Sequence, residues 1–110
     1  MMEQGKKFLS DILWAIELIE SFVPESMTYS DYVSDLKTQS AVERQLGIIG
    51  EAVNKFELLS GSIKITHARK IVGLRNRLIH TYDAIDSSIV WVSIKIHLIP
   101  LKEEILEMLQ

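Results

Sequence analysis

The sequence predicts an all-α protein, an antiparallel up-and-down bundle of four longer helices and one short helix. Apolar residues recur at intervals of three and four positions in the long segments, which is typical of helices that bury one face. We find no segment of useful length in which apolar and polar residues alternate as in a strand. Capping residues, glycines and prolines separate the apolar segments, and 110 residues suit a single domain over 1–110.

The first predicted helix covers residues 6–22 and stops before Pro24, which cannot continue a helical hydrogen-bond ladder. A polar segment follows, in which Thr28 or Ser30 can cap a brief second helix.

The third predicted helix starts at Ser40, which has Glu43 at capping-box spacing, and ends at Gly61, a typical C-terminal glycine. Its core stripe comprises Val42, Leu46, Ile49, Val53 and Phe56. Gly47 and Gly50 lie inside this helix, where each costs about 1 kcal/mol relative to alanine. That cost predicts a close approach there by another helix or by a second copy of the chain.

The fourth predicted helix starts from Thr66 as its N-cap and buries Ala68, Ile71, Leu74 and Leu78. Asp86 can cap the fifth, in which Pro100 should produce a kink or a division into two. The predicted core face of this last helix comprises Ile89, Val92, Ile96, Ile99 and Ile105.

Positive charge is concentrated in one part of an acidic chain. The net charge is -3, yet residues 58–82 contain no acidic residue and carry +5, so the remainder carries -8. The acidic net charge argues against a protein that coats nucleic acid, whereas the basic segment suggests a local anionic ligand. The alternative is a solvated helix face whose partners are acids on neighbouring helices.

Composition also bounds compartment and cofactors. The chain has no cysteine, no uncharged apolar leader and no apolar run long enough for a membrane span, so we expect a cytoplasmic protein. Its three histidines, His67, His80 and His97, are not grouped with acids at metal-ligand intervals. We therefore expect neither a metal nor another cofactor.

The segment "GLRNRLIHTYD", residues 73–83, gathers most of the chemistry. Arg75 and His80 are five residues apart, which on a regular helix separates them by about 140° and about 7.5 Å along the axis. They can share one site if the helix distorts or ends near His80, or if two copies of the chain pair across a two-fold axis.

An arginine and a histidine without a neighbouring carboxylate suit phosphate chemistry. Arginine offers a permanently charged fork to phosphate oxygens, and histidine transfers protons near neutral pH. RNA supplies its own nucleophile, the 2′-hydroxyl, so that this pair suffices without a metal. From residue types alone, an interhelical ion-pair arginine and a surface histidine remain the alternative.

The segment resembles the R-x4-H-x-Y motif of the HepT family, a branch of the HEPN superfamily of helical ribonucleases. "SDILWAIELIESF", "SAVERQLGIIGEAVNKF" and "IPLKEEIL" are similar to other family segments in order and spacing, so the likeness covers nearly the whole chain. One departure is "THARKIVGL", where many relatives have Pro-Trp before the Arg-Lys position.

The resemblance implies roles for individual residues. Arg75 and His80 would be the catalytic pair of an RNA-cleaving toxin, with tRNA as a substrate in some members, and Asn76 would support them. Tyr82 would be AMPylated by a partner nucleotidyltransferase antitoxin, MntA. The family also implies a homodimer with the motif at the dimer cleft, which would bring the pair together.

Other residues have less specific expected roles. Glu51 could orient Arg75 or His80 from a neighbouring helix, or form a routine ion pair. Arg77, Lys70 and Arg69 would be surface charges that steer RNA. The alternative function is a non-catalytic helical module that binds a nucleotide or RNA, or docks a nucleotidyltransferase.

Overall fold

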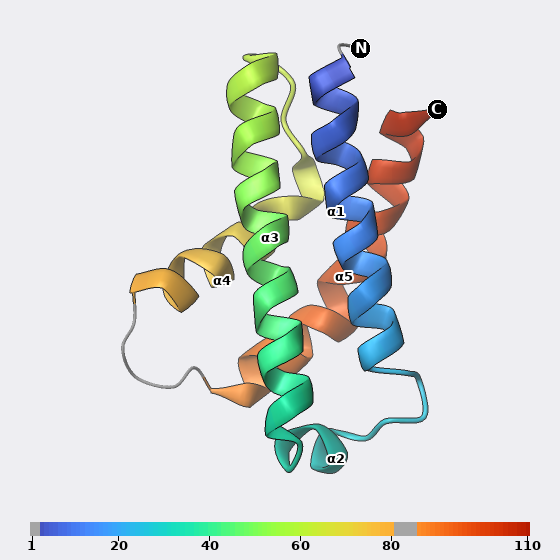
Figure 1. Ribbon diagram of the computed structural model, residues 1–110, viewed down its shortest axis with the longest axis vertical. Coiled ribbons are helices and arrows are strands. Elements are labelled where there is room, and N and C mark those ends of the chain that lie inside the picture. The colour runs from blue at the N-terminus through green and yellow to red at the C-terminus, as the bar shows by residue number, and fades with distance from the viewer. Residues whose placement is uncertain (1–2, 81–85) are drawn as a thin grey trace.

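The computed structural model describes the backbone of residues 3–80 and 86–110, and the side chains of residues 3–77 and 86–110. In these residues it contains the α-helices α1 (Glu3–Phe22), α2 (Tyr29–Val33), α3 (Leu36–Ser60), α4 (Arg69–His80) and α5 (Ser87–Leu109). A 3₁₀ turn, η1 (Thr66–Ala68), precedes α4. Across this described part there is no strand, and the predicted bundle of four longer helices and a short one is confirmed (Figure 1).

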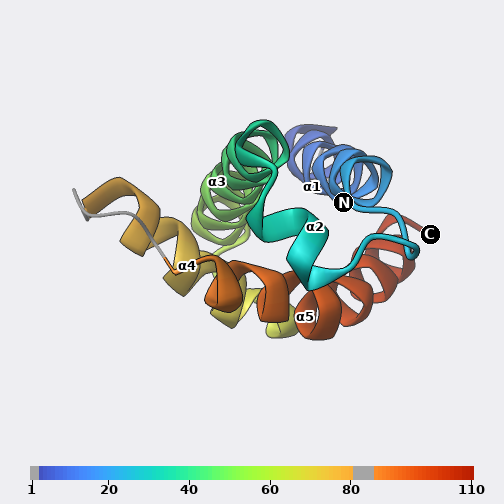
Figure 2. The ribbon, with the colours of Figure 1, turned by 90° about the horizontal axis from the view of Figure 1, so that it is seen from below.

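The helices form two layers. α1 and α3 lie side by side and antiparallel, and α5 crosses behind them (Figure 1). Seen from below, α4 leaves the bundle beside α3 and projects outward, away from α1 (Figure 2). No helix in the described ranges is both long and apolar enough to cross a membrane.

The core lies between the two layers and follows the apolar stripes. Every residue of the stripe predicted for α3 is buried, which confirms that prediction. From α1 the core receives Leu9, Ile12, Ala15, Ile16 and Ile19. Ala68, Ile71 and Leu74 are buried as predicted, whereas the side chain of Leu78 lies outside the described residues.

Local capping signals hold for three helix ends. Thr28 caps α2 through a reciprocal capping box with Asp31, and the Asp86 carboxylate accepts the Ser88 N–H at the start of α5. Gly61 closes α3 at a φ of 72°, a left-handed conformation that favours glycine. These three boundaries confirm the sequence prediction because each cap lies within a few residues of its partner.

Two other helix starts were predicted wrongly. α3 begins at Leu36, before Ser40, because the Asp35 carboxylate accepts the Thr38 N–H at 3.0 Å and the Thr38 hydroxyl at 2.6 Å. Thr66 begins the 3₁₀ turn and does not cap α4 with its side chain. The Thr66 N–H instead donates to the Glu104 carboxylate of α5 at 2.8 Å, a partner that sequence proximity cannot reveal.

The α5 helix departs most from expectation. It continues through Pro100 as one helix, which excludes a division in two and leaves a kink as the predicted alternative. The predicted core face was also wrong: Ile89, Val92, Ile96 and Ile99 are 36–58% exposed. Its buried residues are Val90, Ser93, Ile94, Leu98, Leu101 and Ile105, so that only Ile105 was assigned correctly. The helix carries apolar residues on two faces, and periodicity alone does not choose between them.

Candidate functional site

Arg75 is positioned by an unusually close contact between α3 and α4. A Cβ atom added to Gly50 would lie 2.6 Å from both Cβ and Cγ of Arg75, closer than carbon atoms can approach. The stem of the half-buried Arg75 side chain therefore occupies the space that a side chain at position 50 would fill. The predicted close approach is confirmed at Gly50, whereas a Cβ at Gly47 would meet nothing within 4 Å.

The Arg75 guanidinium has unused hydrogen-bonding capacity. Its Nη1 donates to the Asn76 side-chain oxygen at 3.2 Å, while its buried Nε has no partner among the described atoms. No carboxylate of the described residues forms an ion pair with it. A buried donor without an acceptor is costly, so the guanidinium is suited to receive an oxyanion.

Glu51 is engaged with its own helix. Its carboxylate lies 3.1 Å from the Lys55 ammonium, one turn along α3. This hydrogen bond and charge lower the pKa of Glu51, with a smaller contribution from the positive charge of Arg75. The charge of Arg75 therefore influences Glu51, but the ion pair that Glu51 forms is with Lys55, one of the two roles that the sequence suggested for it.

The remaining motif residues are only partly described. His80 is the last residue of α4, and its side chain lies outside the described residues. Tyr82 lies outside them altogether. The meeting of Arg75, His80 and Tyr82 in one site therefore stays a prediction.

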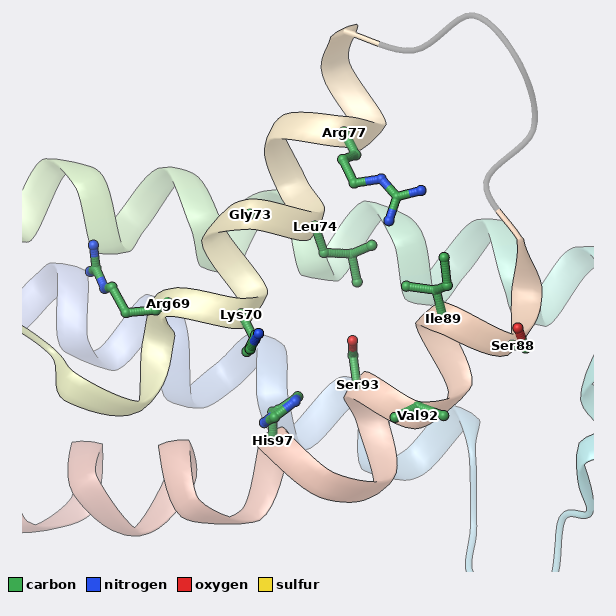
Figure 3. A pocket seen from close by; sticks show the side chains of 10 residues that line it. All are labelled: Arg69, Lys70, Gly73, Leu74, Arg77, Ser88, Ile89, Val92, Ser93 and His97. Atoms are coloured by element: carbon green, nitrogen blue, oxygen red, sulfur yellow. The ribbon is translucent and has the colours of Figure 1, made fainter.

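A groove of about 640 Å³ separates α4 from α5 (Figure 3). Lys70 and Arg77 of α4 and His97 of α5 line it above an apolar floor that includes Leu74 and Val92. Ten residues of the described part of the chain line it, none of them acidic, and a smaller hollow extends it along Lys70 and His97. Within the described residues, neither Lys70 nor Arg77 forms an ion pair. The groove can therefore accept an anion that also has an apolar surface.

Arg69 differs from its cationic neighbours. Its guanidinium points away from Lys70 in Figure 3 and pairs with the Glu57 carboxylate, which is 8% exposed. The same carboxylate accepts the Ile65 N–H at 2.8 Å, at the entry to η1. Arg69 is therefore paired with an acid on a neighbouring helix, which is the alternative that the charge pattern left open. The Glu57 carboxylate largely compensates its positive charge.

Sequence reasoning missed the contribution of α5 to this groove. In the sequence His97 is only a histidine without acids at metal-ligand intervals, and Ser93 carries no functional signal. Both line the groove opposite Lys70 only because the fold places α5 beside α4 (Figure 3). Nothing in their sequence neighbourhood indicates this placement.

These features define an all-helical protein with a cationic groove and an arginine open to an oxyanion. The family model for "Ribonuclease HepT-like" proteins matches residues 12–108, and the chain belongs to this family. A Thermococcus cleftensis protein named "Probable ribonuclease HepT" is 40% identical over 99 residues, 86% of each chain.

Two further relatives carry provisional RNase names. One, from Methanocaldococcus jannaschii, is 34% identical over 90% of this chain and 82% of its own length. The other, from Caldanaerobacter subterraneus, is 30% identical over 99% of this chain and 97% of its own. No solved structure matches the chain.

Proposed function

We propose that this protein is a metal-independent endoribonuclease and the toxin of a two-component toxin-antitoxin pair in the cytoplasm. The observation that carries the proposal is Arg75, whose stem is fixed on Gly50 and whose Nε has no described partner. Membership in the HepT-like family and the ribonuclease names of its relatives supply the reaction class. A transition state with extra negative charge on phosphate needs a positioned, permanent cation of this kind.

In this proposal Arg75 and His80 have different roles in cleavage. Arg75 holds the scissile phosphate, and His80 either takes the proton from the 2′-hydroxyl or gives one to the leaving 5′-oxygen. The 2′-oxygen then forms a bond to phosphorus as the bond to the 5′-oxygen breaks. The products are a 2′,3′-cyclic phosphate and a 5′-hydroxyl, and no metal is required to generate the nucleophile.

The groove between α4 and α5 would hold the RNA strand beyond the cleaved bond. Lys70, Arg77 and His97 line it without an acid, and such contacts attract phosphates irrespective of base sequence. Asn76, which already accepts a hydrogen bond from Arg75, would keep the guanidinium oriented. Two copies of the chain would form a homodimer and a composite cleft, each copy contributing Arg75 and His80.

Cleavage is tested with purified protein of verified unmodified mass, incubated with total tRNA and a labelled oligoribonucleotide in the presence of EDTA. We expect the wild type to cut and to leave 2′,3′-cyclic phosphate ends. Arg75→Ala and His80→Ala should each lose at least about 100-fold in rate, since each removes an electrostatic or proton-transfer contribution. Arg44→Ala, an exposed arginine on α3, is the matched control and should cut normally. New 5′-phosphate ends, or activity only with added metal, would contradict the mechanism.

Regulation would act on Tyr82, two residues beyond His80. An MntA-like nucleotidyltransferase would transfer AMP from ATP to its hydroxyl, with pyrophosphate as the leaving group, and the added phosphate and nucleoside would oppose RNA entry by charge and volume. In cells that express both partners we expect an intact-mass increase of one or more AMP groups. The increase should be absent from Tyr82→Phe. If the modification persists in that variant, the assignment to Tyr82 is wrong.

The alternative, a non-catalytic binding module, is favoured by one observation. The groove cations Lys70 and Arg77 face α5, whereas the Arg75 stem packs on α3, so anion binding does not itself require Arg75. RNA that is bound by the wild type and never cut would support this alternative. Arg75 and His80 would then be ligand contacts.

A further inference from the structure

A carboxylate of α5 holds the entry to α4. Glu104 is partly buried, and its two oxygens accept the N–H groups of Thr66 and His67, each at 2.8 Å. Ile65, the residue that precedes η1, has no side-chain acceptor with which to cap these N–H groups. Glu104 therefore supplies the cap from 37 and 38 residues away, and it places a negative charge where the helix dipole favours one.

A second carboxylate reaches the same entry from α3. Glu57 is 8% exposed, and it accepts the Ile65 N–H at 2.8 Å. The same carboxylate pairs with the guanidinium of Arg69, the first residue of α4. η1 contacts α5, and α4 contacts both α3 and α5. Glu57 and Glu104, here called the entry carboxylates, therefore hold the start of α4 from two neighbouring helices.

The rest of α4 is anchored over only part of its length. Among the described side chains its last buried residue is Leu74, and Asn76 and Arg77 beyond it are exposed. The helix then projects from the bundle (Figure 2). Arg75 directly follows Leu74, so its place depends on the direction in which the anchored half of α4 points.

A projecting helix amplifies a small change at its start. Each helical residue rises by about 1.5 Å, which places Arg75 about 9 Å and His80 about 16.5 Å along the axis from Arg69. A tilt of about 5° at the entry would therefore move Arg75 by about 0.8 Å and the end of α4 by about 1.4 Å. A misplacement of about 1 Å can cost about 100-fold in rate where a side chain must meet a reacting atom.

The contact with α3 sets the direction of such a movement. A Cβ atom at Gly50 would lie 2.6 Å from Cβ and Cγ of Arg75, so α4 already lies as near to α3 as it can. A loosened entry therefore lets α4 swing only away from α3. This movement takes the stem of Arg75 off Gly50.

We propose that Glu57 and Glu104 are positioning residues, which fix the direction of α4 and thereby the place of Arg75. Both act through the backbone of residues 65–67 and through Arg69, so neither needs to contact RNA. The effect on cleavage rests on the proposed function, whereas the effect on α4 follows from these contacts alone.

The direction of α4 is tested by residual dipolar couplings of the backbone N–H groups in the purified full chain. In Glu104→Ala the couplings of residues 70–77 should no longer fit the wild-type orientation, with a change of at least about 5° relative to α1 and α3. Couplings within α1 and α3 should keep their wild-type fit. Glu103→Ala removes an exposed carboxylate of the same helix and is the matched control, which should leave all couplings unchanged.

The effect on catalysis is tested by kcat and KM for the labelled oligoribonucleotide. Glu104→Ala should lower kcat at least about tenfold and change KM less than about threefold, because groove contacts with phosphates tolerate a small shift that the reacting phosphate does not. Glu104→Gln keeps one of the two accepting oxygens and should restore part of kcat. Urea denaturation gives the folded fraction, so that each kcat is expressed per folded molecule.

The outcomes separate this inference from the ribonuclease proposal. Wild-type couplings for α4 in Glu104→Ala, or an unchanged kcat per folded molecule, would overturn the positioning role. A variant that only destabilised the fold would show the second result, because its folded molecules would keep the wild-type kcat. If the wild type itself does not cut RNA, the ribonuclease proposal fails, and the couplings alone decide whether the entry carboxylates direct α4.

Discussion

At the scale of single residues, the position of Arg75 depends on the missing side chain of Gly50. The two residues lie 25 positions apart, yet α4 crosses α3 so closely that the arginine stem takes the place of a Cβ. A glycine inside a helix is about 1 kcal/mol less favourable than alanine. At position 50 the absence of a Cβ atom permits the close crossing of the two helices. The sequence indicated a close approach, and the structure identifies Arg75 as the group that makes it.

This dependence predicts opposite effects for two glycines of one helix. Gly50→Ala should lower the free energy of unfolding by about 1–3 kcal/mol and, by displacing Arg75, reduce RNA cleavage roughly 10- to 100-fold. Gly47→Ala, whose Cβ would meet nothing within 4 Å, should raise stability by about 0.5–1 kcal/mol and leave cleavage unchanged. Urea denaturation and the oligoribonucleotide assay measure both. Equal stability changes for the two variants would show that the contact does not constrain position 50.

Cations that look equivalent in the sequence differ in their structural partners. Arg69, Lys70 and Arg77 belong to one positive segment, but Arg69 pairs with the largely buried Glu57. Lys70 and Arg77 instead line the groove with His97. The amino-acid sequence gives the charge of each residue but does not show which carboxylate forms an ion pair with it.

At the scale of elements, α5 shows where periodicity is insufficient. Its helical state was predicted correctly despite the strand-like segment "VWVSIKIHLI", because Asp86 caps it and its tail is helical. Its buried face was predicted wrongly because apolar residues lie on two opposite faces. Packing against α1 and η1 selects one of them for the core. The other face, with Ile89, Val92, Ile96 and Ile99, remains exposed.

Helix caps give the elements a dependence on pH. Hydrogen bonds from Thr28, Thr38 and Ser88 lower the pKa values of Asp31, Asp35 and Asp86 below the ordinary value near 3.8. The unfolded chain therefore binds these protons more tightly than the folded protein. Their contribution to stability is present above about pH 4 and is lost as the pH falls through the folded-state pKa values. Burial raises the pKa of Glu43, which acts in the opposite direction.

We expect the free energy of unfolding to be lower at pH 3 than at pH 6, as measured by urea denaturation at both values. Asp35→Asn keeps a side-chain oxygen for the Thr38 N–H while removing the titrating group. This variant should show a smaller loss between the two pH values than the wild type. A stability that rises steadily toward pH 3 would indicate that Glu43 outweighs the three caps.

At the scale of the whole molecule, the candidate site exists because distant segments converge. The cationic groove is lined by residues 69–77 of α4 and 88–97 of α5. The stem of Arg75 packs on Gly50 of α3. α4 projects from the bundle, so its outer half is not enclosed by the layer of α1 and α3 (Figure 2).

Short-range patterns in the amino-acid sequence were enough to predict the helical class, most helix boundaries, the core stripe of α3 and the concentration of cations around Arg75. These features depend on interactions between residues a few positions apart, which a linear pattern records directly. Helix packing selects which face of α5 is buried, which carboxylate caps η1, and which cations line a groove. Each of these depends on a partner tens of residues away, and the packing of all the helices together selects that partner.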